Sequence, residues 1–479
     1  MNAPHSRGAE LTLRASSTVQ AGPTERVGRG EAAGSVESTG HPLLFLAYLL
    51  LVFVEYGGLA NQFPILKTVR VATVLSYAVF VAILPSVRSF QLHGSRQVQL
   101  AIAFVVFTVL SVAWADVQMN AFDSIRPLVD YTIFMTLTAT LVDRPERATA
   151  LAAVLSATAV LLVAENLDSL GSASRTGQLT APYFMGDGND FAWGLNVIAP
   201  LSLILLVGQR RVLFWPLGLV GFGSCVMGIV GTQSRGGTLG LGAAVLYAWF
   251  FVAKRKVASA VAMSCLVAGV VYLSPSGYVG RMSTVADYEA DNSAQARLQA
   301  WEAAISMAVD YPLGVGAGNF NSAYGRRYRP EIGEGRVGWG AARWISPHSI
   351  YFKVLGEYGF LGLGLLLWLL VRNLRDNRTT GAAAVSAPVP CVWHRMPSLV
   401  NMSLVAFAVG GIFLGGFSYP HLFLLTGLTV ALKRLGGALE PDVGCAPKRE
   451  SFPGGENGVG VQATGSKAPA VRRDGRLAP

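Results

Sequence analysis

Long apolar blocks alternate with short polar segments along most of the chain. About twelve of these blocks approach the ~20 residues that an α-helix needs to cross a bilayer. We predict spans at residues 43–60, 69–86, 98–115, 125–142, 147–165, 190–208, 212–231, 236–253, 256–274, 348–371, 398–416 and 419–434. The pattern therefore predicts an all-α integral membrane protein with about twelve transmembrane helices.

The two ends of the chain differ from this pattern. Residues 1–41 and 437–479 are rich in small and polar residues and contain no apolar core. The N-terminal segment is not a cleavable signal peptide, because it lacks an apolar central region. We predict two disordered cytoplasmic tails that flank one membrane domain at residues 42–436.

Lysine and arginine in the short loops indicate the orientation of the chain. With the N-terminus in the cytoplasm, most of these residues fall on the inner side, as positively charged loops of membrane proteins do. The C-terminus then also lies inside. Residues 275–347 form the one long outer, periplasmic loop, and its seven arginines indicate an anion-binding surface.

The long loop contains the pattern of an amphipathic helix. Asn292 or Ser293 can cap a helix that ends at Pro312. Its apolar positions recur at helical spacing on one face: Leu298, Trp301, Ile305 and Ala308. We expect this helix to lie at or near the membrane surface.

Composition supports a membrane protein and argues against several other classes. The chain is 52% hydrophobic and 14% charged, with a mean hydropathy of +0.44, whereas soluble domains carry about 25% charged residues. Cytoplasmic loops account for the net charge of +10, so nucleic acid is not an expected partner. The four cysteines have no metal-ligand spacing, and we expect neither a metal nor a cofactor.

Polar motifs lie at the starts of four predicted spans that run from outside to inside. A helix N-terminus offers unpaired N–H groups and about half a positive charge, which suits a phosphate. If the four helices pack together, these ends converge on one outer cavity. The motifs are Gly186–Asp190, Ser234-Arg235, Ser346–His348 and Tyr419–His421.

Two arginines are the candidate ligands of a diphosphate. Ser234 can cap the helix that begins with Arg235, and the glycines that follow allow close approach of a ligand. Arg297 lies beside the apolar stripe of the loop helix. Together they could hold a diphosphate by charge-assisted hydrogen bonds and stabilise it as a leaving group. The alternatives are an Arg235 that reaches lipid headgroups and an Arg297 on a solvated helix face.

His348 is the candidate general base. Ser346 resembles an N-cap and Pro347 suits the first helical position, which would put His348 in the first turn of a helix. The helix dipole disfavours protonation there, so a neutral imidazole could accept a hydroxyl proton. The alternative is an interfacial histidine that only forms hydrogen bonds. His421 has a similar setting, and we interpret it as structural.

Other polar and aromatic residues have less specific interpretations. Asp187 and Asp190 could form a carboxylate pair, but no third metal ligand is evident. Trp301 and Tyr351 could stack on sugars, although anchoring at the membrane interface explains such aromatics equally well.

The motifs together resemble the O-antigen ligase and polymerase superfamily over about residues 185–372. The matching segments are GDGNDFAWGLNVIAPLSL, GTQSRGGTLGLG, ARLQAWEAAISMAVDYPLGVGAGNF and SPHSIYFKVLGEYGFLGLG, in this order. The first resembles the asparagine–aspartate segment that the family places before a membrane helix.

The resemblance implies a metal-independent membrane glycosyltransferase in the bacterial inner membrane, with its active site facing the periplasm. Such enzymes move a glycan from undecaprenyl diphosphate to an acceptor, which can be lipid A core, a protein or a polysaccharide. The family's two arginines and its histidine correspond to Arg235, Arg297 and His348, although Ser349 stands where the family often has asparagine. The remaining candidate substrate-binding residues are Ser234, Asn189, Asp190, Trp301 and Tyr351.

Two other functions stay open at this point. A polysaccharide or exopolysaccharide polymerase of the same superfamily would use the same site, with a second lipid-linked repeat as acceptor. A polysaccharide transporter or flippase is disfavoured, because the two halves of the chain show no repeat and the charged motifs gather at one outer face.

Overall fold

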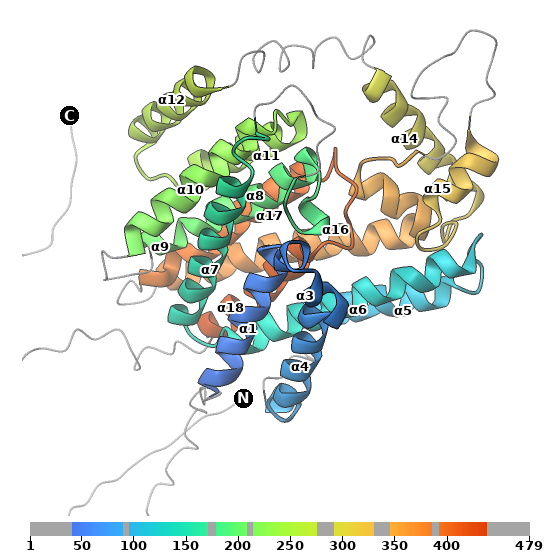
Figure 1. The fold of residues 1–479 in the computed structure, drawn as a ribbon, viewed down its shortest axis with the longest axis horizontal. Helices are drawn as coiled ribbons and strands as arrows, with labels where there is room; N and C mark the ends of the chain where they lie inside the picture. The colour runs from blue at the N-terminus through green and yellow to red at the C-terminus, as the bar shows by residue number, and fades with distance from the viewer. Residues whose placement is uncertain are drawn as a thin grey trace, which may run out of the picture.

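The structure is a computed structural model that describes most of the predicted membrane domain. It covers residues 41–89, 95–170, 179–207, 214–274, 292–329, 345–385 and 392–437. Within these ranges all regular secondary structure is helical, with no strand (Figure 1). Nearly all of the two predicted tails lies outside the described residues.

The helices follow the apolar blocks of the sequence closely. Each of the twelve predicted spans coincides with one main helix. Among the described residues three short α-helices, α2 (Leu59–Gln62), α3 (Pro64–Val69) and α9 (Ile204–Val207), and several 3-10 or π turns lie between them. The main helices are α1 (Pro42–Tyr56), α4 (Val71–Ser89), α5 (Arg96–Ser111), α6 (Gln118–Leu141), α7 (Pro145–Glu165), α8 (Gly188–Ser202), α10 (Phe214–Gly231), α11 (Arg235–Tyr247), α12 (Lys256–Leu273), α16 (Ile350–Val385), α17 (Met396–Gly410) and α18 (Pro420–Gly437). The long loop adds α14 (Asn292–Asp310) and α15 (Phe320–Ala323).

Five of the described helices are long and apolar enough to cross a membrane by themselves. They cover Pro145–Glu165, Gly188–Val207, Phe214–Gly231, Arg235–Val252 and Ile350–Ala384. Five further helices have shorter apolar stretches, of 10–17 residues. The structure therefore supports a multi-pass membrane protein, but it does not confirm the count of about twelve spans.

Helix α6 is long enough to span a bilayer but is less apolar than these five. Its 24 residues carry Asp123 and Arg126 in the half nearer its N-terminus and Asp130 just after that half. Charged side chains inside a membrane are costly and usually serve a function. This half of α6 therefore needs an explanation other than membrane crossing.

Helix α8 lies at the centre of the packed helices, against α7, α10, α11 and α17. About 78% of the apolar stretch that contains α8 is buried inside the protein, compared with 33% of the stretch that contains α11. Asn196 of α8 donates to the carbonyl of Gly237 at 2.8 Å. A Cβ at Gly237 would lie 2.5 Å from the Cβ of Ala192, so glycine permits this close approach of α8 and α11.

The loop helix α14 confirms the predicted helix, whose place at the membrane surface stays a prediction. Its buried face consists of small residues and Met307, and it packs against α16. Of the predicted stripe, Leu298 and Ile305 are exposed and Ala308 is buried. Small side chains are favoured on the face that packs against α16, because they let the two helix backbones approach closely.

A glycine-rich turn connects α14 to the rest of the membrane domain. The N–H groups of Val315 and Gly316 donate to the carbonyls of Gly356 and Glu357, at 3.0 and 3.1 Å. These carbonyls lie beside Gly359, whose φ of +63° interrupts α16. The turn thus satisfies backbone groups at a break in a membrane helix, and Asn319 at its end accepts from the N–H of Val117, between α5 and α6.

The predicted topology can be tested with reporter fusions at Gly335 and Asn457, two positions outside the described residues. We expect residues 275–347 on the outer side and both termini on the inner side, because of the distribution of lysine and arginine. Alkaline phosphatase should therefore be active when fused at Gly335 and inactive at Asn457. Matching signals at the two positions would contradict this topology.

Candidate functional site

The N-terminal ends of α8, α11 and α18 meet through side-chain hydrogen bonds. Ser234, just before α11, donates from its hydroxyl to Oδ1 of Asn189 in α8 at 2.8 Å. Tyr419, just before α18, donates to Oδ2 of Asp190 at 2.8 Å. These hydrogen bonds join three of the four helix starts that were predicted to converge.

Local capping explains why these helices begin where they do. The side chain of Asp187 accepts from the N–H groups of Asn189 and Asp190 at the start of α8, at 2.7 and 2.9 Å. The Ser234 hydroxyl accepts from Gly237 N–H at 3.1 Å at the start of α11. The prediction that Ser234 caps its helix is confirmed, and its hydroxyl also binds the neighbouring α8.

Arg235 is the first residue of α11 and is half-buried. The residue two before it, Gln233, has a φ of +51°, a left-handed conformation that is uncommon for residues other than glycine. Such a conformation persists only where the surrounding structure holds it, and it is common at functional sites. The tight turn directs the chain from α10 into α11 and fixes Arg235 at the positive end of the helix.

His348 lies two residues before α16, which begins at Ile350. The prediction that Ser346 and Pro347 start the helix, with His348 in its first turn, is therefore wrong. His348 instead has a φ of +44°, and it keeps surface open to solvent although protein atoms surround much of its imidazole. The reason is tertiary, because Ile350 N–H donates to the carbonyl of Gly411 at 2.9 Å and so draws the chain towards the loop after α17.

Trp301 of α14 supports the segment that carries His348. Its indole N–H donates to the carbonyl of Pro347 at 2.7 Å. Its ring stacks on Phe352 of α16, with centroids 4.7 Å apart. Arg297 lies one helical turn before Trp301 and is half-buried, so the same contacts that hold the His348 segment also place Arg297 beside it.

Burial by surrounding protein lowers the pKa of His348, and the positive charge of Arg297 lowers it further. Asp187 opposes this shift, whereas Lys353 adds to it. Since a histidine has an ordinary pKa of about 6.5, the imidazole is neutral at pH 7. A neutral imidazole beside an arginine can accept a proton.

Two aromatic side chains proposed to stack on sugars already have protein partners. One face of Trp301 is covered by Phe352. The Tyr351 hydroxyl donates to the carbonyl of Ala408 at 2.7 Å. These contacts assign both residues a part in holding the His348 segment against α14 and α17.

Lys353 was not singled out in the sequence. It lies in the first turns of α16 and acts electrostatically on His348. A lysine inside an apolar block is costly near a bilayer, and this signal could have identified it.

His421 has the structural setting that the sequence suggested. It is fully buried, and the Tyr56 hydroxyl lies 3.2 Å from its Nδ1. Rings of Phe184 and Trp193 pack at right angles to it. Its imidazole has no exposed surface through which it could take a proton from an acceptor hydroxyl.

Among the residues that the structure describes, no three His, Cys, Asp or Glu side chains gather in a way that could hold a metal ion. Arg297, Lys353 and Asp187 act electrostatically on His348, and Arg235 and Asp190 lie at the joined starts of α11 and α8. The three basic residues outnumber the two carboxylates, so these helix starts suit an anion.

One comparison with known proteins bears on this site. A family model described as O-antigen ligase matches residues 220–367, from α10 into α16. The matched region contains Arg235, Arg297 and His348. A comparison with curated proteins gave no match.

Proposed function

We propose that the chain is a glycosyltransferase acting on a glycan linked to undecaprenyl diphosphate, because residues 220–367 match a family model described as O-antigen ligase. It transfers the glycan to an acceptor hydroxyl at the outer, periplasmic face of the bacterial inner membrane. The proposal is supported by the matched region, which contains Arg297 beside His348 and Arg235 at the start of α11, a helix start that is joined to that of α8.

The diphosphate would be bound by Arg235 and Arg297. Guanidinium groups form charge-assisted, bidentate hydrogen bonds with phosphate oxygens. Arg235 adds the positive end of α11 to its own charge. Lys353, whose charge acts on His348 from α16, supplies further positive charge as the leaving diphosphate gains negative charge.

His348 would act on the acceptor. Its neutral imidazole takes the proton of the acceptor hydroxyl as the oxygen attacks the anomeric carbon. The bond between that carbon and the diphosphate oxygen breaks, and both of its electrons leave with undecaprenyl diphosphate. The products are the glycosylated acceptor, undecaprenyl diphosphate and a protonated His348, which returns its proton to solvent.

Transfer by the purified protein in lipid nanodiscs tests this function. The donor is the host's lipid-linked glycan, and the acceptor is lipid A core, a protein or a second lipid-linked glycan. We expect release of undecaprenyl diphosphate that depends on one of these acceptors. The assay is run in excess EDTA, because we expect the arginines and the lysine to neutralise the leaving group without a metal.

The acceptor that supports turnover distinguishes a ligase from a polymerase. A second lipid-linked glycan as the working acceptor would identify a polymerase, and lipid A core or a protein would identify a ligase. Transport of the donor without cleavage of its glycosyl bond would contradict a glycosyltransferase. Activity that EDTA abolishes and only a divalent ion restores would contradict the metal-free mechanism.

A further inference from the structure

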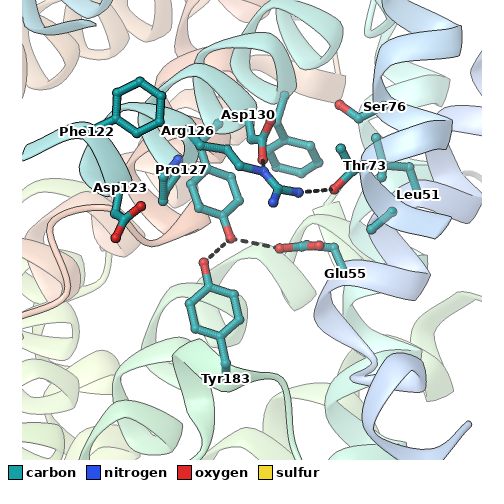
Figure 2. A pocket seen from close by; sticks show the side chains of 13 residues that line it. Leu51, Glu55, Thr73, Ser76, Phe122, Asp123, Arg126, Pro127, Asp130 and Tyr183 are labelled. Atoms are coloured by element: carbon teal, nitrogen blue, oxygen red, sulfur yellow. Dashed lines mark hydrogen bonds and ion pairs between the residues drawn. The ribbon is translucent and has the colours of Figure 1, made fainter. Parts of the chain in front are cut away.

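A polar cavity lies outside the matched region, between α1, α4 and α6. Its volume is about 490 Å³, and Tyr183 closes one side of it (Figure 2). This volume is within the range of about 300–1,000 Å³ that is usual for small-molecule sites. Arg235, Arg297 and His348 do not line it, so the cavity is a separate site.

Three carboxylates and one guanidinium line the cavity: Glu55, Asp123, Asp130 and Arg126. The guanidinium of Arg126 pairs with Asp130 at 3.5 Å and donates to the Thr73 hydroxyl at 3.3 Å. Asp123 is exposed and has no hydrogen-bond or ion-pair partner among the described residues. The lining therefore carries a net negative charge.

Structural needs do not account for this lining. Carboxylates that only stabilise a membrane helix are expected to be paired, because an unpaired charge near hydrocarbon is costly. Here Asp130 binds Arg126 and Tyr77, and Glu55 binds Tyr131, whereas Asp123 lines the cavity without a partner among the described residues. The unused acceptor oxygens indicate a ligand that donates hydrogen bonds.

The hydroxyl groups in the cavity are arranged around Glu55. Tyr131 donates to Oε1 of Glu55 at 2.8 Å, and its oxygen lies 2.6 Å from the Tyr183 hydroxyl. Figure 2 shows Glu55 and Tyr183 directed towards the same region from different elements. Because Tyr131 donates its one hydroxyl proton to Glu55, the Tyr183 hydroxyl donates to the Tyr131 oxygen and can accept a hydrogen bond from a ligand.

The chemistry of the lining selects a neutral, hydroxyl-rich ligand. Its net negative charge repels a diphosphate, which the arginine cluster suits. Carboxylates and Arg126 can bind the hydroxyl groups of a sugar, as acceptors and donor respectively. Phe122, Phe134 and Leu51 offer apolar surface to the C–H faces of a pyranose ring.

Tyrosine side chains connect the cavity to the candidate functional site. The ring of Tyr183 meets that of Tyr419 edge to face, with centroids 6.1 Å apart. Tyr419 in turn binds Asp190, next to the Asn189–Ser234 hydrogen bond. A saccharide that reacts at the arginine cluster therefore has this cavity beside it.

We propose that the cavity binds a neutral sugar unit of a saccharide that reacts at the neighbouring site. This inference rests on the proposed glycosyl transfer. The sugar can belong to the donor glycan or to the acceptor, since both present the same hydroxyl chemistry. The test separates these two sources.

Binding without turnover tests the proposal. The probes are the glycan released by mild acid from the host's lipid-linked donor, the saccharide part of the acceptor, and sugar-free undecaprenyl diphosphate. Each is titrated into nanodiscs that hold the wild type, Asp123→Asn or Glu55→Gln. Asp168→Asn is the matched control, because Asp168 is an exposed acid that does not line this cavity.

We expect each cavity variant to bind one of the two saccharides about tenfold more weakly than the wild type, as loss of a hydrogen bond to a charged group implies. Undecaprenyl diphosphate should bind all variants equally. The saccharide affected identifies the source of the sugar. The proposal is overturned if neither saccharide binds the wild type, if the variants bind both normally, or if binding of undecaprenyl diphosphate falls as well. Because no turnover is measured, these outcomes do not depend on whether Arg235 and Arg297 act as proposed.

Discussion

Replacing Arg297 or Arg235 with alanine is expected to reduce the rate of glycan transfer by about 10²–10³-fold, the usual cost of removing one preorganised group that stabilises a developing negative charge. Lysine at either position should restore little of this rate. A lysine ammonium carries the charge but lacks the planar fork that binds two phosphate oxygens at once.

The measurement is single-turnover release of undecaprenyl diphosphate by purified protein in nanodiscs. Arg326→Ala is a suitable control, because Arg326 is an exposed arginine of the same outer loop. Binding of undecaprenyl diphosphate to each variant should weaken in parallel with transfer. Full activity of the lysine variants at both positions would rule out a diphosphate bound by two arginines.

Replacing His348 with alanine is expected to slow transfer by about 10²–10⁴-fold, the usual contribution of a general base. Binding of undecaprenyl diphosphate should stay near normal, because both arginines remain. The rate of the wild type should also depend on pH. Burial and Arg297 lower the pKa of His348, so the neutral, active form persists as the pH falls past about 6.5, the ordinary value.

The rate should therefore decline only below that pH, as His348 becomes protonated, and the decline should be absent in His348→Ala. His421→Asn is the matched control, since an asparagine can keep the hydrogen bond with Tyr56 in that buried site. If only the His421 variant loses activity, the base lies on α18. If neither variant loses activity, no histidine at these helix ends removes the proton.

The helices themselves followed from the sequence, because a membrane-spanning helix satisfies its own backbone and is marked by a local apolar run. Each predicted span coincides with a main helix. The residue that caps α11 could also be predicted from the sequence. Ser234 caps α11 as predicted, since an N-cap hydrogen bond joins residues three positions apart.

Contacts between distant segments decided what local patterns could not. The prediction that Ser346 and Pro347 begin a helix was wrong. Contacts with Gly411 and Trp301 hold the backbone on either side of His348, so α16 begins only at Ile350. Periodicity found α14 but did not show which of its faces packs against α16, where small side chains let the two helices approach closely.

The sequence by itself determined that this is a helical membrane protein, and its motifs marked Arg235, Arg297 and His348 as the candidate chemistry. Only the tertiary structure placed Arg297 beside His348, brought Lys353 to the same cluster and gathered Glu55, Asp123 and Arg126 around one cavity. The physical reason is the distance along the chain over which each kind of interaction acts. Helix formation and capping depend on neighbours within about one turn, whereas a site depends on which helices lie together, and that is set by side chains far apart in the chain.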